Sequence, residues 1–155
     1  MPGRTLLLDA NVLLLLFVGL HDRRRISHFK NTAQFTEEDF DLLVEIVAQF
    51  DMIAATPHVL TEVSNLAGQL GEPGRSQLFE GLRTQLTILS EPQVAVASAV
   101  TDEGFVRLGV TDAAISVLTR GDPQYVVLTA DLDLWIHLTR AGVNAENFNH
   151  LRRIA

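Results

Sequence analysis

The sequence contains no cysteine, and this absence excludes disulfide bonds, thiolate catalysis and zinc sites built on sulfur ligands. It also has no internal repeat and no low-complexity segment, so nothing in it indicates a solenoid or a disordered chain. Long apolar runs are missing too, since the stretch Thr5–Leu20 is interrupted by Asp9 and Asn11 and is too short to span a bilayer. Because no small-residue cleavage site follows it, we interpret this stretch as a core strand plus a helix, in a cytoplasmic protein without membrane contact.

Positive charge is scarce. The chain has 12 basic and 19 acidic residues and a net charge of −7, which at first disfavours a polyanionic partner. However, several acidic residues belong to one candidate site, where divalent cations would offset most of their charge. These residues are Asp9, Glu62, Asp112, Asp131 and Asp133. With 155 residues, 47% of them hydrophobic, we expect a single domain, residues 1–155, with a sizeable core.

Short apolar strands alternate with amphipathic helices along the chain. We expect strands at Thr5–Leu8, Met52–Ala55, Thr87–Leu89 and Tyr125–Thr129. We expect helices at Asn11–Leu20, Phe40–Phe50, from Pro57 onward, Arg75–Leu86, Val94–Val100, Ala113–Thr119 and Leu132–Arg140. Strands separated regularly by helices predict an α/β fold, a three-layer α/β/α sandwich with a central parallel sheet.

Asp9 is the most informative residue, because it stands between an apolar strand and a leucine-rich helix. Both flanks favour burial, so Asp9 reaches water only at the carboxyl edge of a parallel sheet, where open α/β folds place their ligands. A carboxylate is costly to bury alone, which indicates a cation or a catalytic role. The alternative is a helix cap, the ordinary role of an aspartate before an apolar run.

Three further acids occur in similar contexts. Asp112 follows Thr111 at a helix start and could interact only with the helix dipole. Asp131 follows a strand and could be a second cap, and Glu62 could be a solvated helix residue. Each alternative is reasonable singly, but all four acids are expected at the same edge of one sheet. Their coincidence favours a shared site.

Carboxylates of this kind suit Mg²⁺ or Mn²⁺, which prefer oxygen ligands and act on phosphodiesters by activating water and stabilising the leaving oxygen. No histidine set has metal-ligand spacing, so we expect structural or surface roles for the histidines. These are His21, His28, His58, His137 and His150.

Four segments resemble, in order, the four motifs of PIN-domain ribonucleases, in particular VapC-like bacterial PIN proteins. They are Leu7–Leu14 (LLDANVLL), Thr56–Val63 (TPHVLTEV), Gly109–Ile115 (GVTDAAI) and Val127–Leu134 (VLTADLDL). The resemblance implies a PIN-like fold and a Mg²⁺- or Mn²⁺-dependent endonuclease that hydrolyses RNA.

By position, the resemblance carries catalytic and metal-binding roles over to Asp9, Glu62, Asp112 and Asp131. It implies that Asn11 and Thr129 support these carboxylates by hydrogen bonding. For Asp133 two interpretations stay open, a direct or water-mediated metal ligand or a helix cap close to the site.

Many small bacterial PIN proteins are toxins of toxin–antitoxin pairs, so the resemblance also brings an antitoxin protein and a homodimer into consideration as partners, beside the RNA substrate. This chain departs from their compact form by an insertion at His21–Thr36. The insertion contains Arg23, Arg24, Arg25 and Lys30, which we interpret either as a solvated helix end or as a basic patch that binds RNA phosphates.

Two rival enzyme classes with an acidic strand end, haloacid-dehalogenase-type phosphatases and phosphoacceptor receiver domains, need a lysine late in the chain, and the only lysine is Lys30. The remaining alternative is a catalytically weak PIN-fold protein that serves as an RNA-binding or assembly module.

Overall fold

The computed structural model describes residues 4–155, and its centre is a sheet of four parallel strands in the order β2–β1–β3–β4. The strands are β1 (Thr5–Leu8), β2 (Met52–Ala54), β3 (Tyr125–Thr129) and β4 (Ala145–Asn147). Leu8 at the end of β1 is paired in register with Leu128 of β3. The chain thus places β2 on one side of β1 and β3 on the other, so the order reverses at β1.

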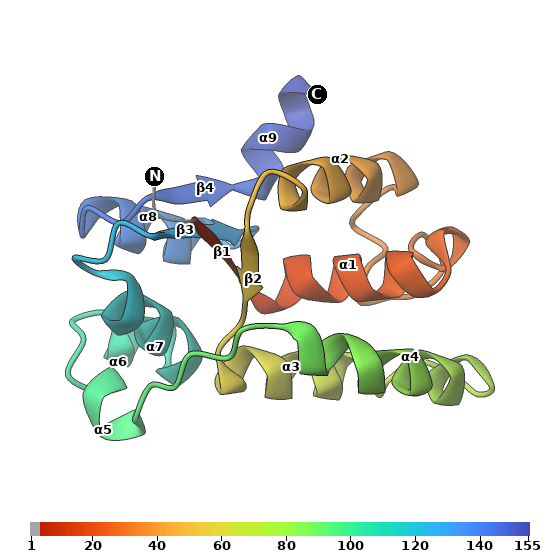
Figure 1. Ribbon diagram of the computed structural model, residues 1–155, viewed down its shortest axis with the longest axis horizontal. Helices are drawn as coiled ribbons and strands as arrows, with labels where there is room; N and C mark the ends of the chain where they lie inside the picture. Colours follow the sequence, from red (N-terminus) through yellow and green to blue (C-terminus); the bar gives the residue numbers. More distant parts are fainter. Residues whose placement is uncertain (1–3) are drawn as a thin grey trace.

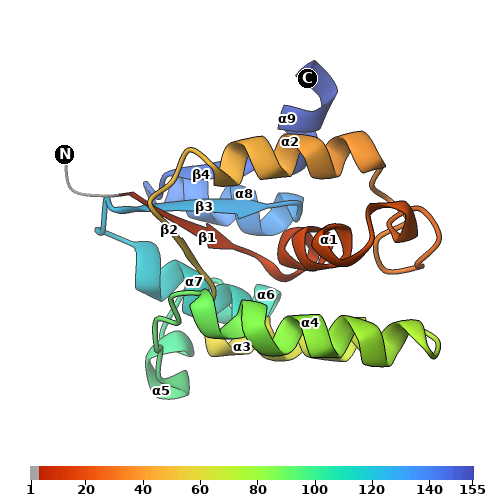
Figure 2. The same ribbon diagram turned by 45° about the vertical axis from the view of Figure 1, so that its right-hand side comes forward.

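Helices cover both faces of this sheet, as Figures 1 and 2 show. The α-helices of residues 4–155 are α1 (Ala10–His21), α2 (Glu37–Val47), α3 (Pro57–Ala67), α4 (Gly74–Ile88), α5 (Val96–Ala99), α6 (Phe105–Leu108), α7 (Val110–Thr119), α8 (Leu132–Arg140) and α9 (Phe148–Ile154). One 3₁₀ turn, η1 (Arg23–Arg25), follows α1. In the three ribbon views α2 and α9 lie on one side, and α3, α4 and α7 lie on the other. The predicted three-layer, PIN-like α/β sandwich is confirmed.

Helix α1 is buried almost all round because it packs against α2, α3 and α4 as well as β3. Its apolar run from Val12 to Val18 is entirely buried, which explains the lack of a polar face in that segment. Gly19 lets the ring of Phe40 on α2 approach the α1 backbone, since a Cβ atom there would overlap that ring. This packing holds the N-terminal end of α1, and with it Asp9, in place.

Two sequence-based expectations about the sheet were wrong. The segment predicted as a strand at Thr87–Leu89 belongs to the end of α4, and only Ser90 forms an isolated bridge, to Ala54. Ile88 is 77% exposed and only Leu89 packs against the core, so this short apolar run lacks the burial of an inner strand. The fourth strand is instead β4, an edge strand whose sequence, Ala-Glu-Asn, carries no apolar alternation from which it could be predicted.

Helix boundaries also differ in the segment before α7. The helix expected over Val94–Val100 is the single turn α5, and α6 is a second short helix that the sequence did not indicate. Thr111 does not cap α7, which begins at Val110 after Gly109. Gly109 has φ of 90°, a conformation that favours glycine, and its backbone turn orients the first residues of α7.

Candidate active site

The candidate site lies where the strand order reverses, at the carboxyl ends of β1 and β3. Asp9 follows β1, and Thr129 ends β3. The Thr129 hydroxyl donates a 2.7 Å hydrogen bond to Asp9 Oδ2, although the two residues are 120 positions apart in sequence. The same hydroxyl accepts a 3.0 Å hydrogen bond from the Asp131 backbone N–H. Such reversal points are where open α/β sheets bind their ligands.

Asp9 and Asp131 also cap helices, so the capping interpretation is correct for them, and it is compatible with their place in one pocket. Asp9 Oδ1 accepts a 2.8 Å hydrogen bond from the Ala10 backbone N–H at the start of α1. Asp131 Oδ1 accepts one of 3.1 Å from Leu134 N–H at the start of α8. Capping uses one oxygen of each carboxylate and fixes its direction.

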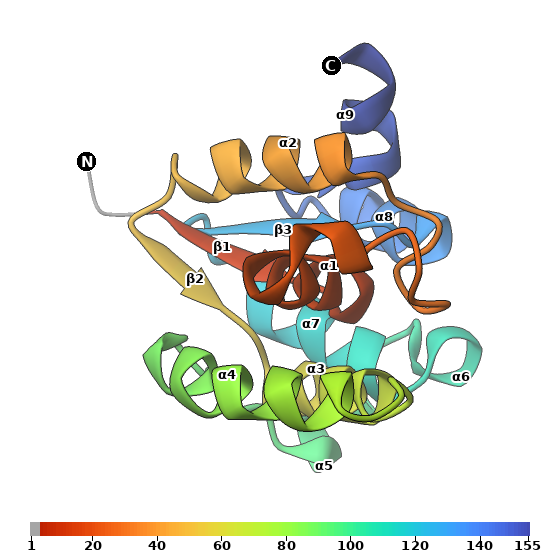
Figure 3. The same cartoon turned by 90° about the vertical axis from the view of Figure 1, so that its right-hand side faces the viewer.

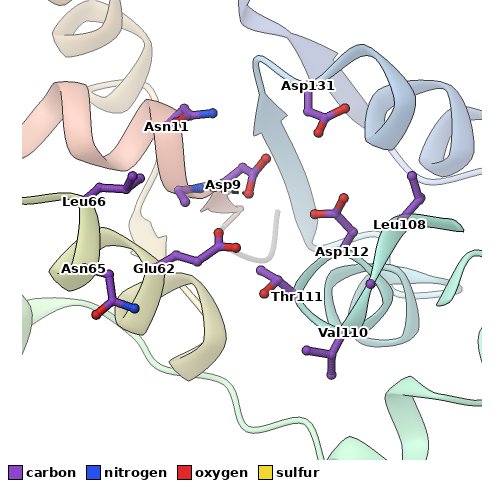
Figure 4. A pocket seen from close by; sticks show the side chains of 12 residues that line it. Asp9, Asn11, Glu62, Asn65, Leu66, Leu108, Val110, Thr111, Asp112 and Asp131 are labelled. Carbon is purple, nitrogen blue, oxygen red and sulfur yellow. Dashed lines mark hydrogen bonds between the residues drawn. The ribbon is translucent and has the colours of Figure 1, made fainter. Parts of the chain in front are cut away.

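Glu62 and Asp112 reach the same space from α3 and α7. Thr56 caps α3 and Pro57 occupies its first turn, which sets Glu62 in the second turn. Asp112 stands in the first turn of α7. Figure 4 shows Glu62 and Asp112 pointing toward each other across the space beside Asp9, with Asp131 on the far side.

These carboxylates line one pocket of about 620 Å³. Its lining residues are Asp9, Ala10, Asn11, Glu62, Asn65, Leu66, Leu108, Gly109, Val110, Thr111, Asp112 and Asp131. The expectation that the four acids meet in one cleft is confirmed, whereas their roles in metal binding and catalysis stay predictions.

Crowding of like charges makes this pocket electrostatically unfavourable. Burial, followed by repulsion from Asp9, Asp131 and Glu62, raises the pKa of Asp112 to about 8. Burial and repulsion from Asp9 also raise the pKa of Glu62, although a hydrogen bond from Thr111 lowers it in part. The pKa of Asp9 is raised mainly by its burial, against the hydrogen bonds from Thr129 and Ala10 that lower it.

The donor set fits a hard divalent cation. Within residues 4–155, none of the four carboxylates forms an ion pair with a basic side chain. Positive charge is therefore what the pocket lacks, and carboxylate oxygens are what Mg²⁺ and Mn²⁺ bind. No three His, Asp or Glu side chains in the described chain already enclose a metal position. Mg²⁺ tolerates such spacing because it usually keeps several of its waters and needs only one or two carboxylates.

The other predicted site residues fall into two groups. Asn11 lines the pocket, and Thr129 supports it from behind through its hydrogen bonds to Asp9 and Asp131. Asp133 is exposed in the first turn of α8 and is not among the pocket-lining residues. Its position therefore favours a charge at the helix start over a direct metal ligand.

The arginines predicted as one phosphate-binding patch do not form a free patch. Arg23 pairs with Asp41 at 2.6 Å and with Glu37 at 3.1 Å. Arg25 is half-buried, its guanidinium lies against Gly74 of α4, and its Nε atom is buried without a hydrogen-bond partner. Arg24 is exposed but lies 3.5 Å from an oxygen of Asp22.

The arginine cluster is also separated from the acidic pocket, although another part of the insertion reaches the pocket wall, where the Asn31 side chain donates a 3.0 Å hydrogen bond to the backbone carbonyl of Leu66. Asp9 precedes α1 and η1 follows it, so the 12-residue helix separates them by about 18 Å. RNA binding by Arg24 and by the exposed Lys30 stays a prediction.

Two polar residues of the pocket lining, Thr111 and Asn65, were not identified as site residues from the sequence. The Thr111 hydroxyl lies close enough to Glu62 to lower the pKa of that carboxyl in part. Asn65 lies three residues after Glu62 on α3, and this spacing places both side chains on one helix face. That spacing was the available signal for Asn65; no such signal existed for Thr111, because its partner comes from another helix.

The fold and the pocket together define a PIN-like α/β protein with an acidic cleft at the carboxyl edge of its sheet. No model of a protein family matches the chain, and no curated protein matches it either. Among solved structures it is similar to VapBC2 from Rickettsia felis, in a crystal structure bound to a DNA fragment from the VapBC2 promoter. The TM-score is 0.56 over 92% of this chain and 98% of the matched chain, at 16% sequence identity. At that identity the likeness concerns the fold.

Proposed function

We propose that this protein is a Mg²⁺- or Mn²⁺-dependent endoribonuclease whose active site is the acidic pocket. The observation that supports this best is the set of four carboxylates around one pocket without a basic partner in residues 4–155. When bound there, a divalent cation would supply the Lewis acidity that phosphodiester hydrolysis needs.

The residues of the chain would divide the remaining work. Asp9 and Asp112 are the more buried of the four acids and would hold the cation, with Glu62 and Asp131 at the rim. Thr129 orients Asp9, and Thr111 orients Glu62. Asn11 and Asn65 are exposed on the pocket wall and would contact the substrate by hydrogen bonds.

The test is cleavage of a mixed RNA pool with millimolar Mn²⁺ or Mg²⁺, compared with the same reaction in EDTA. The parent should cut only with metal, and Asp112→Asn should reduce the rate by at least about a hundredfold, as loss of one preorganised electrostatic group does. Asp133→Asn is the matched control, because Asp133 carries the same charge outside the pocket, and it should cut like the parent. A parent that binds RNA but never cuts it would favour an RNA-binding or assembly module instead.

We further propose an antitoxin protein as a partner, bound in an apolar groove between α1, α2, α4 and the edge strand β2. This groove of about 420 Å³ is far from the acidic pocket residues and includes Leu20, Val44, Met52 and Ile88, which are 52%, 39%, 51% and 77% exposed. Exposed large apolar side chains gathered in one groove are typical of a protein interface. Strand β2 is the edge of the sheet beside them, and its bridge to Ser90 already occupies part of that edge, so the apolar side chains of the groove carry this proposal.

The partner would be sought as the product of a neighbouring gene, co-expressed with this chain. Ile88→Glu should weaken that complex at least tenfold, whereas the exposed Val106→Glu on α6, outside the groove, should not. If Ile88→Glu instead turned a homodimer into a monomer, the groove would be the interface of the predicted homodimer and the antitoxin site would be wrong.

A further inference from the structure

A second cavity, of about 300 Å³, lies between α6 and the C-terminal half of α8. Its lining residues are Glu103, Gly104, Arg107, His137, Arg140 and Ala141. In Figure 3 both helices lie at the right-hand edge of the molecule, with α8 above and α6 below. The lining contains two guanidinium groups and an imidazole but only one carboxylate, that of Glu103. The cavity is therefore rich in basic groups, whereas the pocket around Asp9 is rich in acidic ones.

In the described part of the chain, the side chains of the two cavity arginines have no polar partner. Within residues 4–155, neither the Arg107 nor the Arg140 guanidinium forms an ion pair or donates a side-chain hydrogen bond. Both are exposed. By contrast, Arg23, Arg120 and Arg152 are each paired with an acidic side chain. In a chain with net charge −7, two neighbouring arginines without carboxylate partners leave positive charge available to an external anion.

The buried carboxylate of Asp102 positions two residues that line this cavity, Gly104 and His137. Asp102 accepts hydrogen bonds from Ser116 Oγ at 2.8 Å and from Gly104 N–H at 2.9 Å, and its Oδ2 lies 2.8 Å from His137 Nε2. Arg120 pairs with it at 3.3 Å. A Cβ atom at position 104 would lie 2.8 Å from the His137 ring, so only glycine permits this approach. The wall that carries His137 is therefore preorganised before any ligand arrives.

The cavity is next to the acidic pocket. Arg107 lines the basic cavity, and the adjacent residue Leu108 lines the acidic pocket, so α6 separates the two. Helix α8 connects them on the other side: Asp131 caps its start and Arg140 ends it, about 14 Å further along its nine residues. A strand of nucleic acid that crosses the acidic pocket would pass over α6 and reach Arg107 and Arg140.

We propose that Arg107 and Arg140 bind a backbone phosphate of single-stranded RNA, next to the phosphate that occupies the acidic pocket. This inference rests on the proposed function of that pocket. Guanidinium groups suit phosphate because they offer several N–H donors in a planar fork. Contacts to the backbone position a substrate without reading its sequence. They also supply the attraction that an acidic pocket in an acidic chain cannot.

The experiment measures binding of a short labelled RNA in the Asp112→Asn background with millimolar Mg²⁺, at several salt concentrations. Arg107→Ala with Arg140→Ala should lower the affinity about tenfold at low salt and flatten the log–log salt slope by about 0.7, the contribution of one single-strand phosphate contact. Arg83→Ala with Arg153→Ala is the control with the same change of charge, at exposed arginines outside this cavity, and should change the affinity less than twofold. Arg107→Lys with Arg140→Lys should keep the salt slope, and melting temperatures of all variants establish that they fold.

Equal losses in the cavity variant and in the control would overturn the inference, because the effect would then come from net charge. If the protein does not bind RNA at all, the inference of a phosphate site is also overturned. The cleavage assay separates this inference from the proposed function. If the parent cuts RNA and the cavity variant cuts and binds RNA equally well, the proposed nuclease function is supported, but the cavity is not its phosphate site. If RNA binding depends on both arginines but the parent never cuts RNA, the phosphate site is supported and the proposed nuclease function is wrong.

Discussion

Two aspartates beside helix α7, the buried Asp102 and the half-buried Asp112, have electrostatically opposite surroundings. Asp112 is in the first turn of α7, and Ser116, one turn later, donates to Asp102. Burial alone would raise the pKa of Asp102, but hydrogen bonds from Ser116, Gly104 and His137 outweigh it and lower that pKa. At Asp112 burial acts together with repulsion from three other acids, and the pKa rises to about 8.

The contrast separates a structural carboxylate from a functional one. A buried charge that is fully hydrogen-bonded and paired stabilises the fold around it, whereas one surrounded by like charges costs stability and persists where function needs it. The first holds α6, α7 and α8 together around the basic cavity. The second leaves a pocket that needs a cation.

The largest expected difference is in stability. Asp102→Asn should destabilise the protein by about 2–4 kcal/mol, because it removes the charge that pairs with Arg120 and replaces one of two engaged acceptor oxygens with an NH2 donor. Asp112→Asn should leave the free energy of unfolding unchanged or raise it, since it relieves repulsion while nearly keeping the shape. Urea denaturation of both variants measures this. Similar losses for the two would mean that Asp112 is a structural residue as well.

The second expected effect is that the two acids respond to pH in opposite directions. The folded pKa of Asp112, about 8, lies above the unfolded value of about 3.9, so between them the folded state holds more protons and rising pH destabilises it. The folded pKa of Asp102 is lowered, so its stabilisation is present above the unfolded value and is lost as pH falls further. Thermal melts from pH 4 to 9 should show a decline toward pH 8 that is smaller in Asp112→Asn. An identical decline in that variant would contradict the assignment.

A smaller effect is expected from metal. Millimolar Mg²⁺ or Mn²⁺ should raise the melting temperature. A metal concentration of ten times the dissociation constant stabilises the folded state by about 1.4 kcal/mol. The shift should be larger at pH 8 than at pH 6, because protons compete for Asp112. The metal-induced shift should shrink in Asp112→Asn. It should persist in Asp102→Asn, although that variant melts at a lower temperature than the parent. A shift of the same size in all three proteins would place the cation elsewhere.

The smallest effect is expected at the first arginine cluster. Arg23→Ala should change the free energy of unfolding very little, because exposed ion pairs such as those with Asp41 and Glu37 are screened by water. It should not change RNA affinity, because this guanidinium is already engaged. A loss of RNA binding as large as that of the Arg107 and Arg140 variant would show that the substrate extends to the far end of α1.

The sequence was sufficient for the layered fold and for the acidic residues of the site. The apolar strands at Thr5–Leu8 and Tyr125–Thr129 and the helix after Thr56 match the structure, because burial and capping leave local patterns. Asp9, Asp112 and Asp131 were recognisable because they recur where strands or loops lead into helices, which places them at one expected edge of the sheet; each alone is an ordinary helix-start residue. The polar edge strand β4 leaves no such pattern and was missed.

Only the tertiary structure decided which charges are free and which are paired. Arg23 and Arg107 look alike in sequence as exposed arginines, yet one lies against two acids from α2 and the other lies beside Arg140 without a carboxylate partner in residues 4–155. Asp102 gave no local signal, since its partners come from α7 and α8. The reason is physical: hydrophobic burial is encoded by neighbours along the chain, whereas electrostatic partners meet through space.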